Sequence, residues 1–132
     1  MNEVDAIIND QSALTKAISE SPYVAQAVAV QAGSGTPSKD VVLTDYLTAI
    51  GKNNNGLYEN FFITANTAGI ADCLGGVTLH DVTGEPWYDA CKKSDCFLGN
   101  NISPVTGKPV YVISYAIKDP ETGNFVGALN ND

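Results

Sequence analysis

The sequence contains no arginine and has one histidine, His80, and one tryptophan, Trp87. Arginine grips carboxylate and phosphate groups with a rigid fork, so an anionic ligand would depend on lysine, backbone amides or hydroxyls. The 15 acidic residues outnumber the seven lysines and give a net charge of −8. Because this charge repels polyanions, it argues against contacts with nucleic acid or an anionic membrane surface. Neutral or cationic ligands fit the charge better.

Long apolar runs are also lacking. No stretch approaches the roughly 20 apolar residues that span a bilayer, and no signal-peptide pattern opens the sequence. With 132 residues, 44% of them hydrophobic and 17% charged, we expect one soluble globular domain over residues 1–132. The single histidine follows no metal-ligand spacing, so the sequence predicts neither a metal site nor another cofactor.

Three cysteines, Cys73, Cys91 and Cys96, leave at least one thiol outside any internal disulfide. Cys91 and Cys96 are the candidate pair, because the four intervening residues let a chain leaving a helix fold back for bridging geometry. The alternative is a pair of reduced thiols beside a helix end. The spacing leaves both redox states open.

Residues 1–56 are predicted to form a helical arm. Apolar residues recur there at three- and four-residue spacing, which draws an apolar stripe along each helix. Pro22 interrupts the first stripe and suits the first turn of a new helix. Ser38 is the expected cap of the third helix, and Gly51 its expected end. The expected helices span residues 4–18, 23–31 and 41–50.

Residues 57–132 are predicted to form an α/β core. β-Branched and aromatic residues dominate five short segments, and Pro86 favours a helix start. Proline and glycine between Asp119 and Gly123 predict a hairpin turn. The expected strands span residues 61–64, 69–73, 97–101, 109–118 and 124–132, with a helix over residues 86–92. This order predicts an α+β fold with a central antiparallel sheet of about five strands.

Four segments in order resemble the Cache family of bacterial sensor domains: residues 58–64, 85–88, 106–114 and 127–132. That family has a PAS-like fold and usually lies outside the membrane in chemoreceptors and sensor histidine kinases. The resemblance implies a long N-terminal helix with short flanking helices, a homodimer formed through that helix, and no enzymatic activity. It also implies an extracytoplasmic location in an inner or plasma membrane receptor, with the membrane anchors outside this sequence.

Relatives that bind amino acids carry a tyrosine, an arginine, a Pro-Trp-Tyr segment and a late aspartate. On that template these positions fall on His80, Glu85, Trp87, Tyr88 and Asp132, so three of the five match. In the family the aspartate holds the ligand's amino group, while the arginine and the aromatic residues hold its carboxylate. Glu85 reverses the charge of the arginine position.

This reversal bears on the ligand. At about 4 Å and an effective dielectric constant of about 20, two unit charges interact by roughly 4 kcal/mol before desolvation. Glu85 would repel a carboxylate and attract an amine, while Trp87 and Tyr88 offer ring faces to a cation. The hypothesis is therefore an amine, a diamine or a quaternary ammonium ligand. Strand alternation adds Asn130, on the face of Asp132, and Ser114 as further candidates.

Each candidate also has a structural alternative. Trp87 and Tyr88 are common core residues, and Glu85 suits the first turn of a helix. Asp132 is a terminal residue and His80 fits a loop.

The function that follows is a small-molecule sensor domain for chemotaxis or two-component signalling. The alternatives are a sensor for an amino acid or organic acid held by backbone amides and lysine, and a ligand-free dimerisation module. A catalyst would have to use Cys73, His80 and Asp81, and no nucleophile elbow or oxyanion loop accompanies them.

Overall fold

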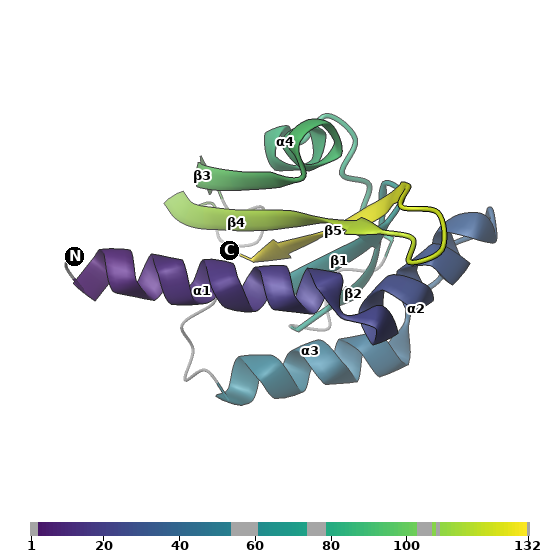
Figure 1. Cartoon of the computed structure of the whole chain (residues 1–132), viewed down its shortest axis with the longest axis horizontal. Helices are drawn as coiled ribbons and strands as arrows, with labels where there is room; N and C mark the ends of the chain where they lie inside the picture. The colour runs from purple at the N-terminus through teal and green to yellow at the C-terminus, as the bar shows by residue number, and fades with distance from the viewer. Residues whose placement is uncertain (1–2, 54–60, 74–78, 103–106, 108, 132) are drawn as a thin grey trace.

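The computed structural model describes residues 3–53, 61–73, 79–102, 107 and 109–131. Its helices and strands follow the order α1, α2, α3, β1, β2, α4, β3, β4, β5 (Figure 1). The helices are α1 (Glu3–Glu20), α2 (Pro22–Gly33), α3 (Val41–Asn53) and α4 (Pro86–Ser94). The strands are β1 (Phe61–Ala65), β2 (Ala68–Asp72), β3 (Cys96–Ile102), β4 (Pro109–Lys118) and β5 (Phe125–Asn131).

The strands form one antiparallel sheet in the order β2-β1-β5-β4-β3. Figure 1 shows α1, α2 and α3 on one face of this sheet and α4 on the other. The predicted α+β fold with a central antiparallel sheet is confirmed. None of the helices in the described part of the chain combines the length and hydropathy needed to span a bilayer.

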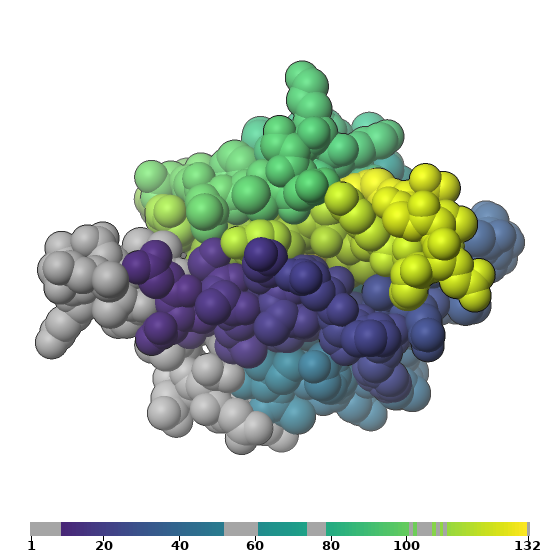
Figure 2. Space-filling view, viewed as in Figure 1, coloured from purple at the N-terminus to yellow at the C-terminus, as the bar shows by residue number. Residues whose placement is uncertain are grey.

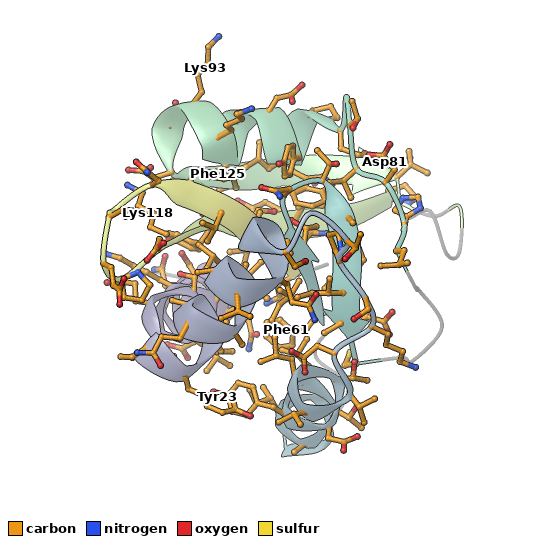
Figure 3. All side chains as sticks on the ribbon, turned by 90° about the vertical axis from the view of Figure 1, so that its right-hand side faces the viewer. Tyr23, Phe61, Asp81, Lys93, Lys118 and Phe125 are labelled. Atoms are coloured by element: carbon orange, nitrogen blue, oxygen red, sulfur yellow. The ribbon has the colours of Figure 1, made fainter. Side chains whose placement is uncertain are left out.

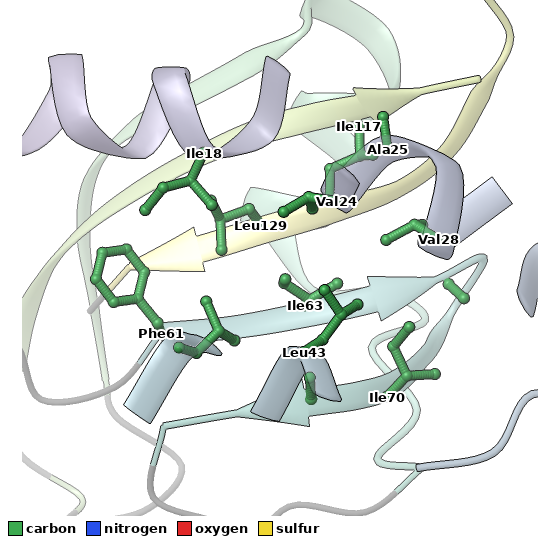
Figure 4. Packing of buried hydrophobic residues seen from close by; sticks show 13 residues of the cluster. Ile18, Val24, Ala25, Val28, Leu43, Phe61, Ile63, Ile70, Ile117 and Leu129 are labelled. Carbon is green, nitrogen blue, oxygen red and sulfur yellow. The ribbon is translucent and has the colours of Figure 1, made fainter. Parts of the chain in front are cut away.

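A separate hydrophobic cluster lies on each face of the sheet. The larger cluster fills the space between the sheet and the three helices α1, α2 and α3 (Figure 4). The smaller one lies under α4, and it includes both Trp87 and Tyr88. Hydrophobic residues therefore pack on both faces of the sheet.

Helix α3 begins differently from the prediction. The capping side chain is Asp40 rather than Ser38: the Asp40 carboxylate accepts a hydrogen bond from the backbone N–H of Leu43 (2.9 Å). The backbone N–H of Asp40 also donates to the carbonyl of Ile70 on β2 (2.7 Å). This tertiary contact anchors the start of the helix at Asp40. The helix also continues through Gly51 to Asn53, because one glycine weakens a helix by only about 1 kcal/mol.

The β4–β5 connection forms the predicted turn. The N–H of Gly123 donates to the carbonyl of Asp119 (2.8 Å), and the N–H of Asp119 donates to the carbonyl of Asn124 (2.8 Å). Gly123 has a φ of 75°, a conformation that favours glycine. The turn directs β5 back along β4 with its alternate residues on the two faces of the sheet.

Candidate ligand-binding site

One row of residues crosses all five strands. Phe62 pairs with Asp72 on one side and with Asn130 on the other, and Ser114 pairs with Asn130 and with Phe97. Residues directly opposite one another in neighbouring strands share a face of the sheet. Phe62 belongs to the cluster under α4, so this face is the one that α4 covers. We call these five residues the transverse row.

The transverse row contains three buried polar side chains. Asp72 is 1% exposed, Ser114 0% and Asn130 6%. The Ser114 hydroxyl donates a hydrogen bond of 2.6 Å to the Oδ1 atom of Asn130. Small-molecule sites typically contain a small number of polar groups among apolar and aromatic side chains.

Five aromatic rings extend over the same face of the sheet. The centroids of successive rings are 6.2, 6.3, 6.0 and 5.6 Å apart, and every contact is edge-on. Such edge-to-face packing is favourable for aromatic side chains. The rings belong, in order, to His80, Phe62, Trp87, Tyr88 and Phe125. Figure 3 shows Phe125 beneath α4, whereas Lys93 extends away from the molecule.

Gly69 makes room for the ring of Phe62. A Cβ atom at position 69 would lie 2.5 Å from two carbons of that ring. Gly69 also exchanges backbone hydrogen bonds with the segment that follows: its N–H donates to the carbonyl of His80 (2.8 Å), and its carbonyl accepts from Leu79 (2.7 Å). This pairing holds the exposed His80 against the edge of β2, beside Phe62.

Glu85 occupies the N-cap position of α4, directly before Pro86. Its side chain makes no capping hydrogen bond and is partly buried, while its backbone carbonyl accepts from Tyr88 and from Asp89 (3.1 Å each). The carboxylate therefore stands at the start of the helix that carries Trp87 and Tyr88. A negative charge is favourable at this end of a helix.

Burial raises the pKa of the Tyr88 phenol, and the negative charges of Asp89 and Asp81 raise it further. Tyr88 is therefore a neutral phenol at physiological pH and can act as a hydrogen-bond donor. The hydroxyl and the backbone N–H of Thr83 both donate to Asp81, which lowers the pKa of that carboxyl. Asp81 thus remains ionised in its exposed turn.

The cysteines are free thiols in this structure. Cys91 is buried in the cluster under α4, whereas Cys96 pairs with Tyr115, whose hydroxyl contacts Ser12 of α1 (2.8 Å). The two thiols therefore face opposite sides of the sheet. Burial raises the pKa of the Cys91 thiol to about 12, with smaller contributions from Cys96 and Asp95.

Four of the candidate residues from the sequence lie on the α4 face: Trp87, Tyr88, Ser114 and Asn130. His80 adjoins them through Phe62, and Glu85 begins the helix above them. Asp132 lies outside the described residues. Asp72 and Phe62 belong to the row but were not among the candidates, because only the strand register shows that Phe62 opposes Asn130 and that Asp72 opposes Phe62.

A groove of about 680 Å³ lies where α1 and α2 meet β3, β4 and the turn after β4, and Figure 2 shows the α1 side of this region. Lys118 and Asp95, both among its lining residues, form an ion pair of 3.0 Å. Within the described ranges, no group of three or more His, Cys, Asp or Glu side chains is arranged to hold a metal ion.

Several solved structures share this fold. The sensor domain of the histidine kinase DctB from V. cholerae matches with a TM-score of 0.74 and 10% identity, over 97% of this chain and 49% of that one. The sensory domain of the Campylobacter jejuni chemoreceptor Tlp3 matches with a TM-score of 0.66 and 16% identity, over 98% and 53%. The ligand-binding domain of the Pseudomonas fluorescens chemoreceptor CtaA, in complex with L-serine, matches with a TM-score of 0.59 and 18% identity, over 97% and 54%.

The chain thus spans about half the length of these solved structures. No family model matches the sequence, and no curated protein matches it either. The chain has the fold of sensor domains from histidine kinases and chemoreceptors, in agreement with the resemblance to the Cache family.

Proposed function

We propose that this chain is the extracytoplasmic sensor domain of a membrane signalling receptor and binds a small molecule on the face of the sheet under α4. The observation that carries the proposal is the buried, hydrogen-bonded pair Ser114 and Asn130 beside the aromatic side chains of α4. The fold supports it, since the matching structures are sensor domains rather than enzymes. Its role is recognition, not catalysis.

The proposed ligand carries an amine or another cationic group. The chain has no arginine to grip a carboxylate, and Glu85 places a negative charge at the start of α4. Trp87 and Tyr88 supply aromatic surface that can favour a cation by about 0.5–2 kcal/mol. The alternative is an amino acid, as in CtaA with L-serine and Tlp3 with L-valine. Here its carboxylate would have to rely on lysine or backbone amides.

The path from this site to the N-terminal helix runs through β5. Asn130 faces the site, and its neighbour Asn131 faces α1, because successive strand residues point to opposite faces. The Asn131 amide donates to the hydroxyl of Thr15 (3.1 Å) and to the side-chain oxygen of Gln11 (3.5 Å). A ligand that shifts β5 would therefore act on α1 directly. We propose that the homodimer contact lies on α1.

Calorimetric titration tests the proposal with three classes of compound: amines such as 1,4-diaminobutane and tetramethylammonium, amino acids such as L-serine and L-valine, and dicarboxylates such as succinate. We expect binding of amines and weaker binding of dicarboxylates. Ser114→Ala should reduce the affinity, because it removes the donor that orients Asn130. A folded wild-type protein that binds no compound of the three classes would overturn the proposal.

A charge reversal tests the ligand class. Glu85→Arg should shift the preference towards carboxylate-bearing compounds, since it restores a cation at the start of α4. Asp89→Arg is the matched control, because it makes the same charge change on an exposed residue of the same helix. Unchanged binding profiles for Glu85→Arg would place Glu85 outside the site.

A further inference from the structure

We propose that a second copy of this chain adds its β3 to β3, so that the two sheets join edge to edge; this contact is separate from the one proposed on α1. β3 and β2 are the two edge strands of the described sheet. The β2 edge is covered, because Gly69 forms backbone hydrogen bonds with Leu79 and His80. Within the described ranges, β3 is therefore the edge at which a further strand can pair.

The hydrogen bonds to β4 show which backbone groups of β3 face outwards. The N–H of Ala116 on β4 donates to the carbonyl of Asp95 (2.8 Å), directly before β3. In an antiparallel pair such bonds recur at every second residue, so the backbone groups of Leu98 and Asn100 point away from β4. Pro109 has no N–H and lies opposite Ile102, which fits this pattern. The outer edge of β3 thus presents donors and acceptors to another strand.

The side chains along this edge are largely apolar and exposed. Alternate strand residues share a face, so Leu98 and Ile102 lie on the α1 side of the sheet with Cys96. Helix α1 packs against β4 and β5 on this side, and β3 lies beyond β4 (Figure 1). Leu98 is 48% exposed and Ile102 57%, and Tyr111, opposite Asn100, is 39% exposed. These side chains form one apolar patch beside the edge.

The charge of the chain indicates what pairs with this edge. β3 contains no acidic or basic residue, although the whole chain carries a net charge of −8. Edge strands are commonly protected from pairing by charges, prolines or bulges, whereas β3 pairs with β4 without a register shift. Two copies of a negative chain repel each other least where uncharged surfaces meet. A two-fold axis would bring the same uncharged strand to both sides of the contact.

The side chains also select the register of this contact. The residues whose backbone groups face outwards pair with the same set of residues in the second copy. Placing Asn100 opposite the partner's Asn100 brings Leu98 opposite the partner's Ile102, so apolar side chains meet on both sides of the axis. The two Asn100 amides can then hydrogen-bond to each other. A shift of two residues would place Asn100 opposite Leu98 or Ile102 instead.

Disulfide trapping tests this register. Asn100→Cys is made in a Cys96→Ser background, and covalent dimers formed in a glutathione redox buffer are followed on non-reducing gels. In the proposed register the two Cα atoms at position 100 lie about 5.5 Å apart, which suits a disulfide. The Cys96→Ser protein without the second substitution measures crosslinking through the remaining cysteines.

Leu98→Cys in the same background is the matched control, because it substitutes an exposed residue of the same edge and face. Position 98 of the second copy lies about 13 Å from it, beyond the reach of a disulfide. We expect Asn100→Cys to form dimers at least about tenfold faster than Leu98→Cys, and a mixture of the Leu98→Cys and Ile102→Cys proteins to form mixed dimers. Equal rates for the two single substitutions, or no dimer of folded Asn100→Cys, would overturn the inference.

Sedimentation of the chain with its native cysteines gives a second test. Leu98→Lys places a charge on the edge and should weaken self-association at least about tenfold. Val30→Lys makes the same change at an exposed residue of α2 and should leave self-association unchanged. Equal self-association of the wild type and Leu98→Lys would overturn the inference. Ligand binding is measured separately, so this result would leave the proposed function standing.

Discussion

Replacing Asn131 by alanine should weaken the attachment of α1 to the sheet. Asn131 is 3% exposed and Thr15 is 0% exposed, so their hydrogen bond of 3.1 Å is shielded from water. The longer contact with Gln11, at 3.5 Å, adds less. The substitution removes both contacts at once.

The size of the effect follows from the groups left behind. A neutral hydrogen bond contributes about 1 kcal/mol, and a buried group without a partner costs about 1–3 kcal/mol. The Thr15 hydroxyl still donates to the carbonyl of Gln11 (2.6 Å), so it loses only an incoming donor. We therefore expect Asn131→Ala to lower the free energy of unfolding by about 2 kcal/mol. The coupling energy between Asn131→Ala and Thr15→Val in a double-mutant cycle should be about 1 kcal/mol.

Urea denaturation of the wild type, both single variants and the double variant measures this shared energy. Ser19→Ala is the control partner, because its hydroxyl bonds within α1, to the carbonyl of Lys16, and it should combine additively with Asn131→Ala. A coupling energy below about 0.3 kcal/mol between Asn131 and Thr15 would refute the proposed contact between β5 and α1. It would also remove the physical basis for signal transfer through β5.

Four further predictions concern stability and reactivity. Gly127→Ala should lower the free energy of unfolding by about 3 kcal/mol or more, because a Cβ atom at position 127 would lie 1.9 Å from the carbonyl oxygen of Thr64. A thermal unfolding midpoint close to that of the wild type would contradict this prediction. Asp40→Ala should cost about 1 kcal/mol in urea denaturation through loss of the α3 cap, whereas Lys39→Ala should cost little. At pH 8, iodoacetamide should modify Cys96 but not Cys91 in the folded protein, as peptide mass spectrometry would show, because the Cys91 pKa of about 12 keeps its thiol protonated. Burial raises this pKa above its ordinary value of 9.0. The contribution of the protonated Cys91 thiol to the free energy of unfolding is therefore fully present below about pH 9, and it should decline as the pH rises towards 12.

The helices and strands were largely predictable because their signals are local. β4 spans Pro109–Lys118, the same residues that its β-branched and aromatic side chains predict. The turn before β5 follows from Pro120 and Gly123. The start of α3 was not predictable in this way, since Ser38 and Asp40 are both good caps. The hydrogen bond from Asp40 to Ile70 on β2 decided between them, and that contact depends on the tertiary structure.

The residues of the candidate site, too, could be predicted only in part. The sequence by itself determined an antiparallel α+β domain without arginine, because periodicity and charge can be read along the chain. The resemblance to the Cache family pointed to Trp87 and Tyr88, and strand alternation pointed to Ser114 and Asn130. Alternation shows which residues share a face of one strand, but not which residues of another strand lie opposite. Only the register of the folded sheet placed Asp72 in the row with Asn130 and turned Asn131 towards α1. Cross-strand pairing joins residues far apart in sequence, and it is therefore decided by the packing of the whole domain.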